Sequence, residues 1–156
     1  MSNAAIAMDL EEREAVPGGE PRKRANQFVT FYVGENAYGI DIMAVREIRS
    51  WTPTTVLPDQ AYGARGVLDI RGKIVEVFDL SLVLGSGGRD QQANQVVLVV
   101  AIADRDVGLA VDSVSDIVDA ADGDFAEPPA KGGKVAAMVR QNEQLISILD
   151  LDVLFN

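Results

Sequence analysis

The sequence predicts an all-β fold made of two small, related β-rich subdomains that share one hydrophobic core. Short apolar runs rich in Val, Ile and aromatic residues alternate with turns marked by Gly, Asn or Asp, which is typical of strands and hairpins. No periodic apolar segment is long enough for more than a short helix. The sequence also resembles itself at a spacing of about 70 residues, which indicates an internal duplication.

The ordered domain is expected to span residues 26–156. Residues 1–25 mix small residues, charges and a PGGEP break, with no pattern that predicts a buried face. Such a composition predicts a flexible N-terminal tail. The remaining residues suffice for one domain, or for two small subdomains around a joint core.

The first half of the domain predicts two hairpins separated by a broken connection. Pro53 and Pro58 interrupt the chain between them. The predicted elements are strands over 28–33 and 37–42, a short helical turn within 43–48, a strand near 47–50, and strands over 67–70 and 74–78.

The second hairpin belongs to a unit that reads RGVLDIRGKIVEVFDLSLVLG over residues 65–85. Arg71, Gly72 and Lys73 separate its two apolar runs and predict the turn. Asp79 stands where a helix N-cap would stand, before a Leu-rich turn that Gly85 closes.

The second half predicts a similar succession of short elements. They are a surface loop over 86–94, strands over 95–103 and 107–112 joined by a turn at 104–106, a loop over 119–133, strands over 135–139 and 145–149, and a last helical turn over 151–155.

The repeat separates residues that both halves contain from residues found in only one. Gly39 aligns with Gly108, which predicts a tight strand position in each half. Asp79 aligns with Asp150, and both precede a Leu-rich turn, so we predict that both are structural helix caps. A second acidic match aligns Glu47 with Asp116, and the sequence does not decide whether these two residues have a structural or a functional role.

Arg71 differs, because it aligns with Asn142, and Gly72 aligns with Glu143. The first half therefore has a charged, rigid turn where the second has an ordinary polar one. Arg71 is either a bidentate partner for a carboxylate of another protein or a solvated hairpin tip. The residues alone leave both interpretations open.

The composition argues against most chemistry. The net charge of −10 disfavours binding to nucleic acid or to anionic lipid. The chain has no Cys and no His, and no phosphate-binding or zinc-binding motif. The acidic stretches at 112–116 and 119–124 do not have the spacing of a calcium loop. We therefore expect no catalytic residue, no cofactor and no metal.

Targeting signals are not evident either. No apolar run approaches the roughly 20 residues of a membrane span, and three glutamates lie within the first 15 residues, where a signal peptide needs an apolar core. We expect a cytoplasmic binding module.

Several motifs resemble the CheW family of chemotaxis coupling proteins. They are VREI at 45–48, RGVLDIRGKIV at 65–75, VFDL at 77–80, DSVSD at 112–116 and LDL at 149–151. The resemblance covers residues 27–155, and the run GV-x-x-x-RG-x-I/V…DL is its most specific part. Asp69 stands where the family usually has Asn, and Glu76 where it usually has Pro. Asp69 lacks the donor of an amide, which puts local partner contacts in doubt.

The resemblance implies two packed five-stranded SH3-like β-barrel subdomains. It also implies a non-catalytic adaptor between methyl-accepting chemotaxis receptors and a CheA-type histidine kinase. One barrel would pair with a related barrel in the kinase regulatory domain, while the helical receptor tip would lie in the groove between the barrels. Association with membrane receptor arrays would then be through partners. The residues that match family contact positions are Val45, Glu47, the Arg65-Gly66 turn and Arg71.

Two alternatives remain. The chain could be the coupling adaptor of a chemosensory array with an output other than motility, which would use the same surface. A more remote alternative is a small carboxylate-dependent hydrolase. Two observations argue against it: the chain lacks His and Cys, and its acids stand at predicted helix caps.

Overall fold

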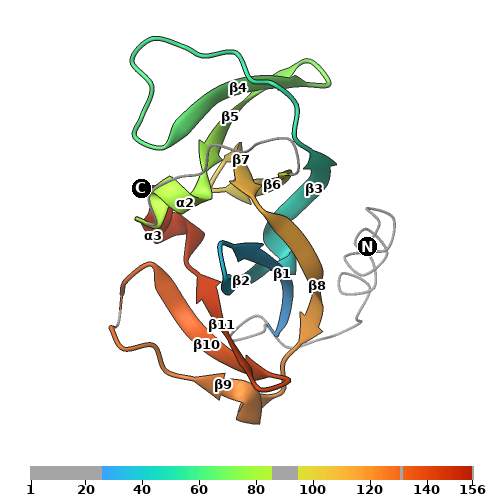
Figure 1. Ribbon diagram of the computed structural model, residues 1–156, viewed down its shortest axis with the longest axis vertical. Coiled ribbons are helices and arrows are strands. Elements are labelled where there is room, and N and C mark those ends of the chain that lie inside the picture. The colour runs from blue at the N-terminus through green and yellow to red at the C-terminus, as the bar shows by residue number, and fades with distance from the viewer. Residues whose placement is uncertain (1–25, 86–94, 131, 156) are drawn as a thin grey trace.

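Two β-sheets, one above the other in Figure 1, make up most of the protein. The computed structural model describes residues 26–85, 95–130 and 132–155. The predicted tail over 1–25 and the predicted surface loop over 86–94 lie outside the described residues.

Eleven strands and four short helices follow one another along the described residues. The first half contains β1 (Gln27–Val33), β2 (Asn36–Asp41), the 3-10 helix η1 (Ile42–Ala44), β3 (Val45–Ser50), β4 (Ala64–Ile70), β5 (Lys73–Asp79) and α2 (Leu80–Val83). The second half contains β6 (Val96–Ile102), β7 (Arg105–Val111), β8 (Ser113–Asp119), the 3-10 helix η2 (Asp122–Asp124), β9 (Phe125–Ala126), β10 (Val135–Gln141), β11 (Gln144–Leu149) and α3 (Leu151–Phe155).

The all-β prediction is confirmed, and the strands form one six-stranded and one five-stranded sheet. Sheet A has the order β8-β1-β2-β11-β10-β9, and sheet B has the order β3-β6-β7-β5-β4. Sheet A has six strands instead of the predicted five because the two-residue strand β9 pairs along β10.

The two halves of the repeat do not correspond to the two sheets. Strands β1 and β2 of the first half join β8–β11, while β6 and β7 of the second half join β3–β5. Each exchange is completed by a parallel pairing, β2 with β11 and β5 with β7. Each sheet therefore combines strands of both halves, because the halves exchange a hairpin.

The two repeated glycines lie at these parallel pairings. Gly39 is opposite Ile148, and Gly108 is opposite Val77. A Cβ at Gly39 would lie 2.8 Å from Ile148 Cδ1, and one at Gly108 would lie 3.1 Å from Val77 Cγ2. The predicted tight strand positions are confirmed, and close approach at the exchanged pairing explains the match.

The core has three parts, one of which belongs to both sheets. The shared cluster includes Phe31 and Ile40 of sheet A with Leu98 and Leu109 of sheet B. Two smaller clusters lie within sheet A and within sheet B. The joint core that the sequence predicts is thus present, and hairpin exchange makes the sheets mutually dependent.

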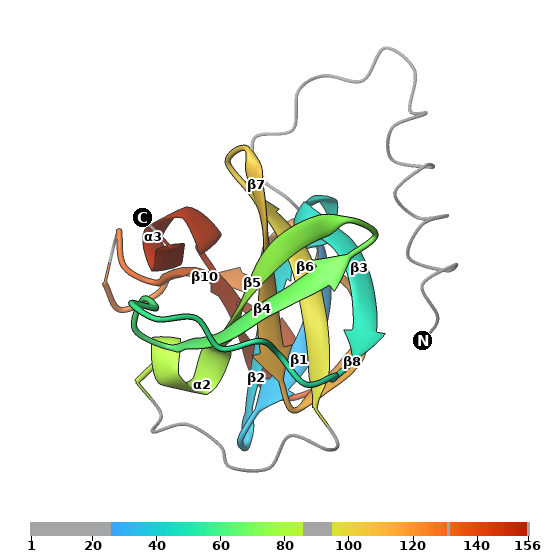
Figure 2. The same cartoon turned by 90° about the horizontal axis from the view of Figure 1, so that it is seen from above.

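Helices α2 and α3 lie on the same side of the molecule in Figure 1 and Figure 2. The rings of Phe78 and Phe155 are 5.0 Å apart, so α3 packs against the end of β5. Lys134 Nζ donates to the Val83 carbonyl of α2 at 3.1 Å. These contacts connect the ends of the two sheets.

Both predicted helix caps stand where a helix begins. Asp79 Oδ1 accepts a hydrogen bond from Ser81 N at 3.0 Å at the start of α2. Asp150 Oδ1 accepts from Val153 N at 3.1 Å at the start of α3. Each carboxylate satisfies a backbone donor that the helix leaves unpaired.

Two local predictions were wrong. Strand β8 was not predicted, because its partner is β1, with Thr30 opposite Asp116 across 86 residues of sequence. The turn expected at 104–106 lies earlier, since β7 already begins at Arg105 and Ala103 has a φ of 55°.

Candidate functional site

Four exposed cations lie on sheet B or in its β4–β5 turn, each in an ion pair: Arg46, Arg71, Lys73 and Arg105. Their side chains are 49–76% exposed. Each is paired with a carboxylate that is only 15–32% exposed, and these carboxylates are Glu47, Asp106 and Glu76. These three acids are therefore recessed. Asp69, two residues before Arg71, and Asp104, next to Arg105, are exposed, so the surface carries charges of both signs.

Arg71 pairs with Glu47, which lies 24 residues earlier in β3. Glu47 is also 3.6 Å from Arg49. Arg71 is therefore more than a solvated hairpin tip, because a recessed carboxylate fixes its guanidinium while most of the side chain remains exposed. Two of the predicted contact residues are thus brought together.

The hairpin turn at Arg71 has the same backbone conformation as its counterpart in the other half. Arg71 and Gly72 have φ of 54° and 85°, and Asn142 and Glu143 have φ of 51° and 63°. Both are two-residue turns with positive φ at both positions, the type I′ pattern. The expected contrast between a rigid and an ordinary turn was wrong, and the asymmetry lies in the side chains alone.

The two departures from the family pattern have local explanations. Asp69 Oδ1 accepts a hydrogen bond from Gly72 N at 2.8 Å, a contact that needs only an oxygen, as Asn would also supply. Glu76 Oε1 lies 3.7 Å from Arg105 Nη1, so the acid that replaces the family's Pro forms an ion pair with β7.

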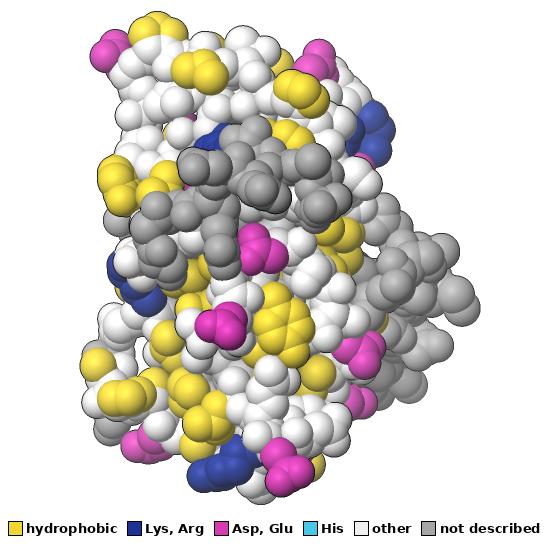
Figure 3. Space-filling model, viewed as in Figure 1, with side chains coloured by type: hydrophobic (Ala, Val, Ile, Leu, Met, Phe, Trp, Pro, Cys, Tyr) yellow, Lys and Arg dark blue, Asp and Glu magenta, His cyan; other side chains and the backbone are white. Residues whose placement is uncertain are grey.

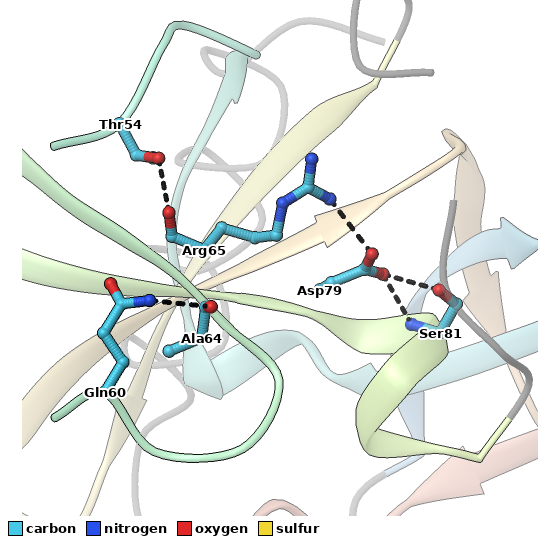
Figure 4. Close-up of polar contacts among 6 residues, drawn as sticks. All are labelled: Thr54, Gln60, Ala64, Arg65, Asp79 and Ser81. Carbon is cyan, nitrogen blue, oxygen red and sulfur yellow. Dashed lines mark hydrogen bonds and ion pairs between the residues drawn. The ribbon is translucent and has the colours of Figure 1, made fainter. Parts of the chain in front are cut away.

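Arg65 is held inside a polar network rather than presented at the surface (Figure 4). Its Nη1 lies 3.0 Å from Asp79 Oδ2, and the two side chains are only 14% and 2% exposed. The guanidinium is also 5.2 Å from the centre of the Trp51 ring, within the range of a cation–π contact. The other oxygen of Asp79 accepts from Ser81 N and Oγ.

The predicted Arg65-Gly66 turn was wrong, because both residues lie within β4 at an irregularity in its pairing with β5. Gly66 has a φ of 133°, and a Cβ there would lie 2.5 Å from the Thr55 carbonyl oxygen. This glycine lets the chain over residues 51–63 approach β4 closely.

Several hydrogen bonds hold that connection in place. Thr55 and Val67 exchange backbone hydrogen bonds of 2.9 and 2.8 Å. Thr54 Oγ1 donates to the Arg65 carbonyl at 2.7 Å, and Gln60 Nε2 donates to the Ala64 carbonyl at 3.2 Å (Figure 4). Arg65 and Gly66 therefore position the connection.

The connection over residues 51–63 exposes large apolar side chains. Val56 is 71% exposed and Tyr62 is 77% exposed, and Leu57 is also exposed. Its only charged residue is Asp59. Clustered exposed apolar residues mark an interaction surface. The sequence interpretation missed this surface, although the scarcity of charge was a usable signal.

Val45, also predicted as a contact residue, is only 2% exposed and belongs to the shared core. A partner cannot reach its side chain directly. Val45 is the first residue of β3, which also carries Arg46 and Glu47, and its side chain packs into the shared core.

A groove with a volume of about 450 Å³ lies where sheet A meets β6 of sheet B. Phe28, Phe125 and Leu151 give it an apolar lining, to which Ala101 of β6 also contributes. Asp41, Asp150 and Asp152 also line it. On the face drawn in Figure 3, acidic and hydrophobic side chains lie interspersed.

The described residues offer no gathered set of three or more acidic side chains that could hold a metal ion. In the same part of the chain, no helix has the length and apolar character to cross a membrane.

The comparisons with known proteins agree with the geometry. A family model described as a CheW-like domain matches residues 27–156. The "Chemotaxis protein CheW" of Rhizobium meliloti is 38% identical over 103 residues, which cover 66% of each chain. The "Probable chemotaxis protein CheW" of Rhizobium etli is 30% identical over 83% of this chain and 87% of its own.

A solved structure has the same fold. The crystal structure of the scaffolding protein TtCheW from Thermoanaerobacter tengcongensis superposes with a TM-score of 0.78 at 27% sequence identity. The match covers 85% of this chain and 94% of that chain.

Proposed function

The chain belongs to the CheW family of chemotaxis scaffold proteins. On that premise, we propose that it is a non-catalytic adaptor that couples methyl-accepting chemotaxis receptors to a CheA-type histidine kinase. The observation that carries the proposal is the presence of two surfaces of different chemistry. One is the groove lined by carboxylates, and the other is sheet B with the ion-paired Arg71 and the apolar connection over residues 51–63. An adaptor needs two such surfaces to bind two partners at once.

The groove suits the helical tip of a receptor. Its apolar lining offers a surface for the apolar stripe of an amphipathic helix. Asp41, Asp150 and Asp152 favour basic side chains on the flanks of that helix. This assignment predicts that high salt weakens receptor binding.

Sheet B suits the kinase regulatory domain. Val56, Leu57 and Tyr62 supply exposed apolar area, and Arg71 supplies a guanidinium whose orientation Glu47 fixes. Apolar anchors together with an oriented Arg are typical of binding hot spots. In this proposal Arg65 and Gly66 position the apolar connection, and Val45 supports the strand that carries Glu47.

The acidic side chains have structural roles that fit a binding protein better than a hydrolase. Asp79 and Asp150 cap helices, Asp69 accepts from a turn amide, and Glu47 holds Arg71. Together with the lack of His and Cys, this supports a protein without catalysis that acts in the cytoplasm and reaches receptor arrays through its partners.

The experiment is a pull-down of the full chain with the kinase regulatory domain and with a receptor tip. The variant Arg71→Glu reverses the oriented charge, and Arg140→Glu is the matched control, because Arg140 is an exposed arginine on β10 of sheet A. We expect Arg71→Glu to weaken kinase-domain binding and Arg140→Glu to leave it unchanged. Equal binding by the parent and both variants would contradict the role of Arg71.

A further inference from the structure

Glu47 lies between two arginines of different exposure. Its Oε1 accepts a hydrogen bond from Arg71 Nη2, and its Oε2 lies 3.6 Å from Arg49 Nη1. The second contact is an ion pair, but it is too long for a hydrogen bond. Arg71 is exposed, whereas Glu47 and Arg49 are partly buried. One recessed carboxylate thus lies between an outer arginine, to which it is hydrogen-bonded, and an inner one.

The inner arginine has an unsatisfied donor. Among the described residues, no acceptor lies within hydrogen-bond range of Arg49 Nε, and this atom is shielded from solvent. A buried donor without an acceptor costs free energy and is uncommon in folded proteins. The Nε and Nη groups of a guanidinium form a fork that fits the two oxygens of a carboxylate. Glu47 already lies beside this fork and has the chemistry to fill it.

Strand β3 holds both side chains over apolar residues. Glu47 and Arg49 are two residues apart, so they project from the same face of β3. Their partners on β6 are Val99 and Val97, which belong to the core cluster within sheet B. Charges beside such a cluster are screened less than charges in water. Glu47 therefore needs a cation at all times.

We propose that Arg49 is an alternative partner for Glu47, to which its carboxylate moves when a carboxylate of another protein binds Arg71. In the free protein, Glu47 fixes the guanidinium of Arg71. An incoming carboxylate that approaches Arg71 also approaches Glu47, and like charges at such short separations repel each other. By moving to the Nε–Nη side of Arg49, Glu47 keeps a cation and leaves the donors of Arg71 to the partner. Arg49 is thus a positioning residue, because it acts on the partner through Glu47.

The exchange depends only on contacts within the chain, and removal of Arg71 should also cause it. Its use in binding the kinase regulatory domain rests on the proposed function. The two claims can therefore be tested separately.

NMR of the arginine Nε–Hε groups tests the exchange in the full chain without a partner. In the parent, we expect the Arg49 Hε resonance at the shift of a guanidinium without a hydrogen bond. In Arg71→Ala, Glu47 should turn to Arg49, so this resonance should move downfield and its exchange with water should slow. Adding Glu47→Ala should reverse both effects.

Two NMR results would overturn the proposal. One is an Arg49 Hε resonance that is the same in the parent and in Arg71→Ala. The other is a downfield resonance that persists after Glu47→Ala is added. That result would assign the bond to a different acceptor, such as Gln95, whose buried Oε1 has no donor in the described part of the chain.

Urea denaturation gives a second readout. Arg71→Ala and Arg49→Met each leave Glu47 with one cation, so each should lower the urea midpoint by only about 0.2 M. The double variant leaves Glu47 with neither arginine, and its loss should exceed the sum of the single losses by about 0.5 M or more. The matched control is Arg71→Ala with Arg105→Ala, whose losses should add, because Arg105 pairs with Glu76. Additive losses for Arg71 and Arg49 would also overturn the proposal.

Binding of the kinase regulatory domain tests the use of the exchange. Arg49→Met should raise the Kd roughly five- to tenfold, a loss of about one factor of ten in the binding constant at most, because Glu47 then cannot leave Arg71 without losing its cation. An unchanged Kd would contradict a role of the exchange in binding. If the parent itself does not bind, the adaptor function fails, whereas the NMR and urea results still decide whether the exchange occurs.

Discussion

Asp79 and Asp150 occupy equivalent positions in the repeat, but the structure predicts that their loss has unequal costs. Replacing either by Ala removes a helix cap, which costs about 1 kcal/mol. Asp79 also pairs at 3.0 Å with Arg65, and the two side chains are 2% and 14% exposed. Breaking a buried ion pair costs about 3–5 kcal/mol. Since Arg65 keeps some exposure and its contact with Trp51, we expect about 3 kcal/mol for Asp79→Ala and about 1 kcal/mol for Asp150→Ala.

Urea denaturation measures this difference. With a slope of about 2 kcal/mol per molar, the midpoint should fall by about 1.5 M for Asp79→Ala and by about 0.5 M for Asp150→Ala. Asp79→Asn keeps an acceptor for Ser81 but removes the charge, so its loss should be intermediate.

A double-mutant cycle isolates the ion pair. Combining Asp79→Ala with Arg65→Ala should give a coupling of about 1.5–3 kcal/mol, as for a hydrogen bond between charged groups. Equal losses for Asp79→Ala and Asp150→Ala, or a coupling near zero, would refute the conclusion that this network supports the fold.

Two further predictions concern the backbone. Gly108→Ala places a Cβ 3.1 Å from both Val77 Cγ2 and Val97 Cγ1, so overpacking should lower the free energy of unfolding, measured in urea, by about 1–3 kcal/mol. The control is Gly123→Ala, where a Cβ meets nothing within 4 Å. Equal stability of the two variants would count against the close approach at Gly108. Glu143 has a left-handed backbone with a φ of 63°, which Gly adopts without strain, so Glu143→Gly should raise the free energy of unfolding by about 0.5–1 kcal/mol. A lower thermal midpoint for this variant would show that the turn is not strained there.

The sequence predicted local structure well, because hairpins and short helices depend on nearby residues. The pairing of β1 with β2 and of β4 with β5 follows from alternating apolar residues around a turn. The caps at Asp79 and Asp150 likewise act within three residues.

The exchange of hairpins between the sheets could not be predicted, since it depends on pairing between distant segments. Strand β8 needs β1, and the parallel partners Gly39 and Ile148 come from opposite halves. Alternation predicts that a segment is a strand but does not identify its neighbour.

The candidate site was predicted only in part for the same reason. Arg71 and Glu47 were each singled out, but their pairing crosses 24 residues. Arg65 was expected at a surface turn, and its burial depends on Asp79 and on Trp51. A sequence motif identifies such residues without showing which of them a partner can reach.

The most direct test of the adaptor function is size-exclusion chromatography of the full chain with a receptor tip and a kinase regulatory domain from the same source. We expect the three proteins to elute together as one complex, and the receptor tip and kinase domain to elute apart when the chain is omitted. Separate elution of all three proteins at concentrations where each is folded would contradict the adaptor function.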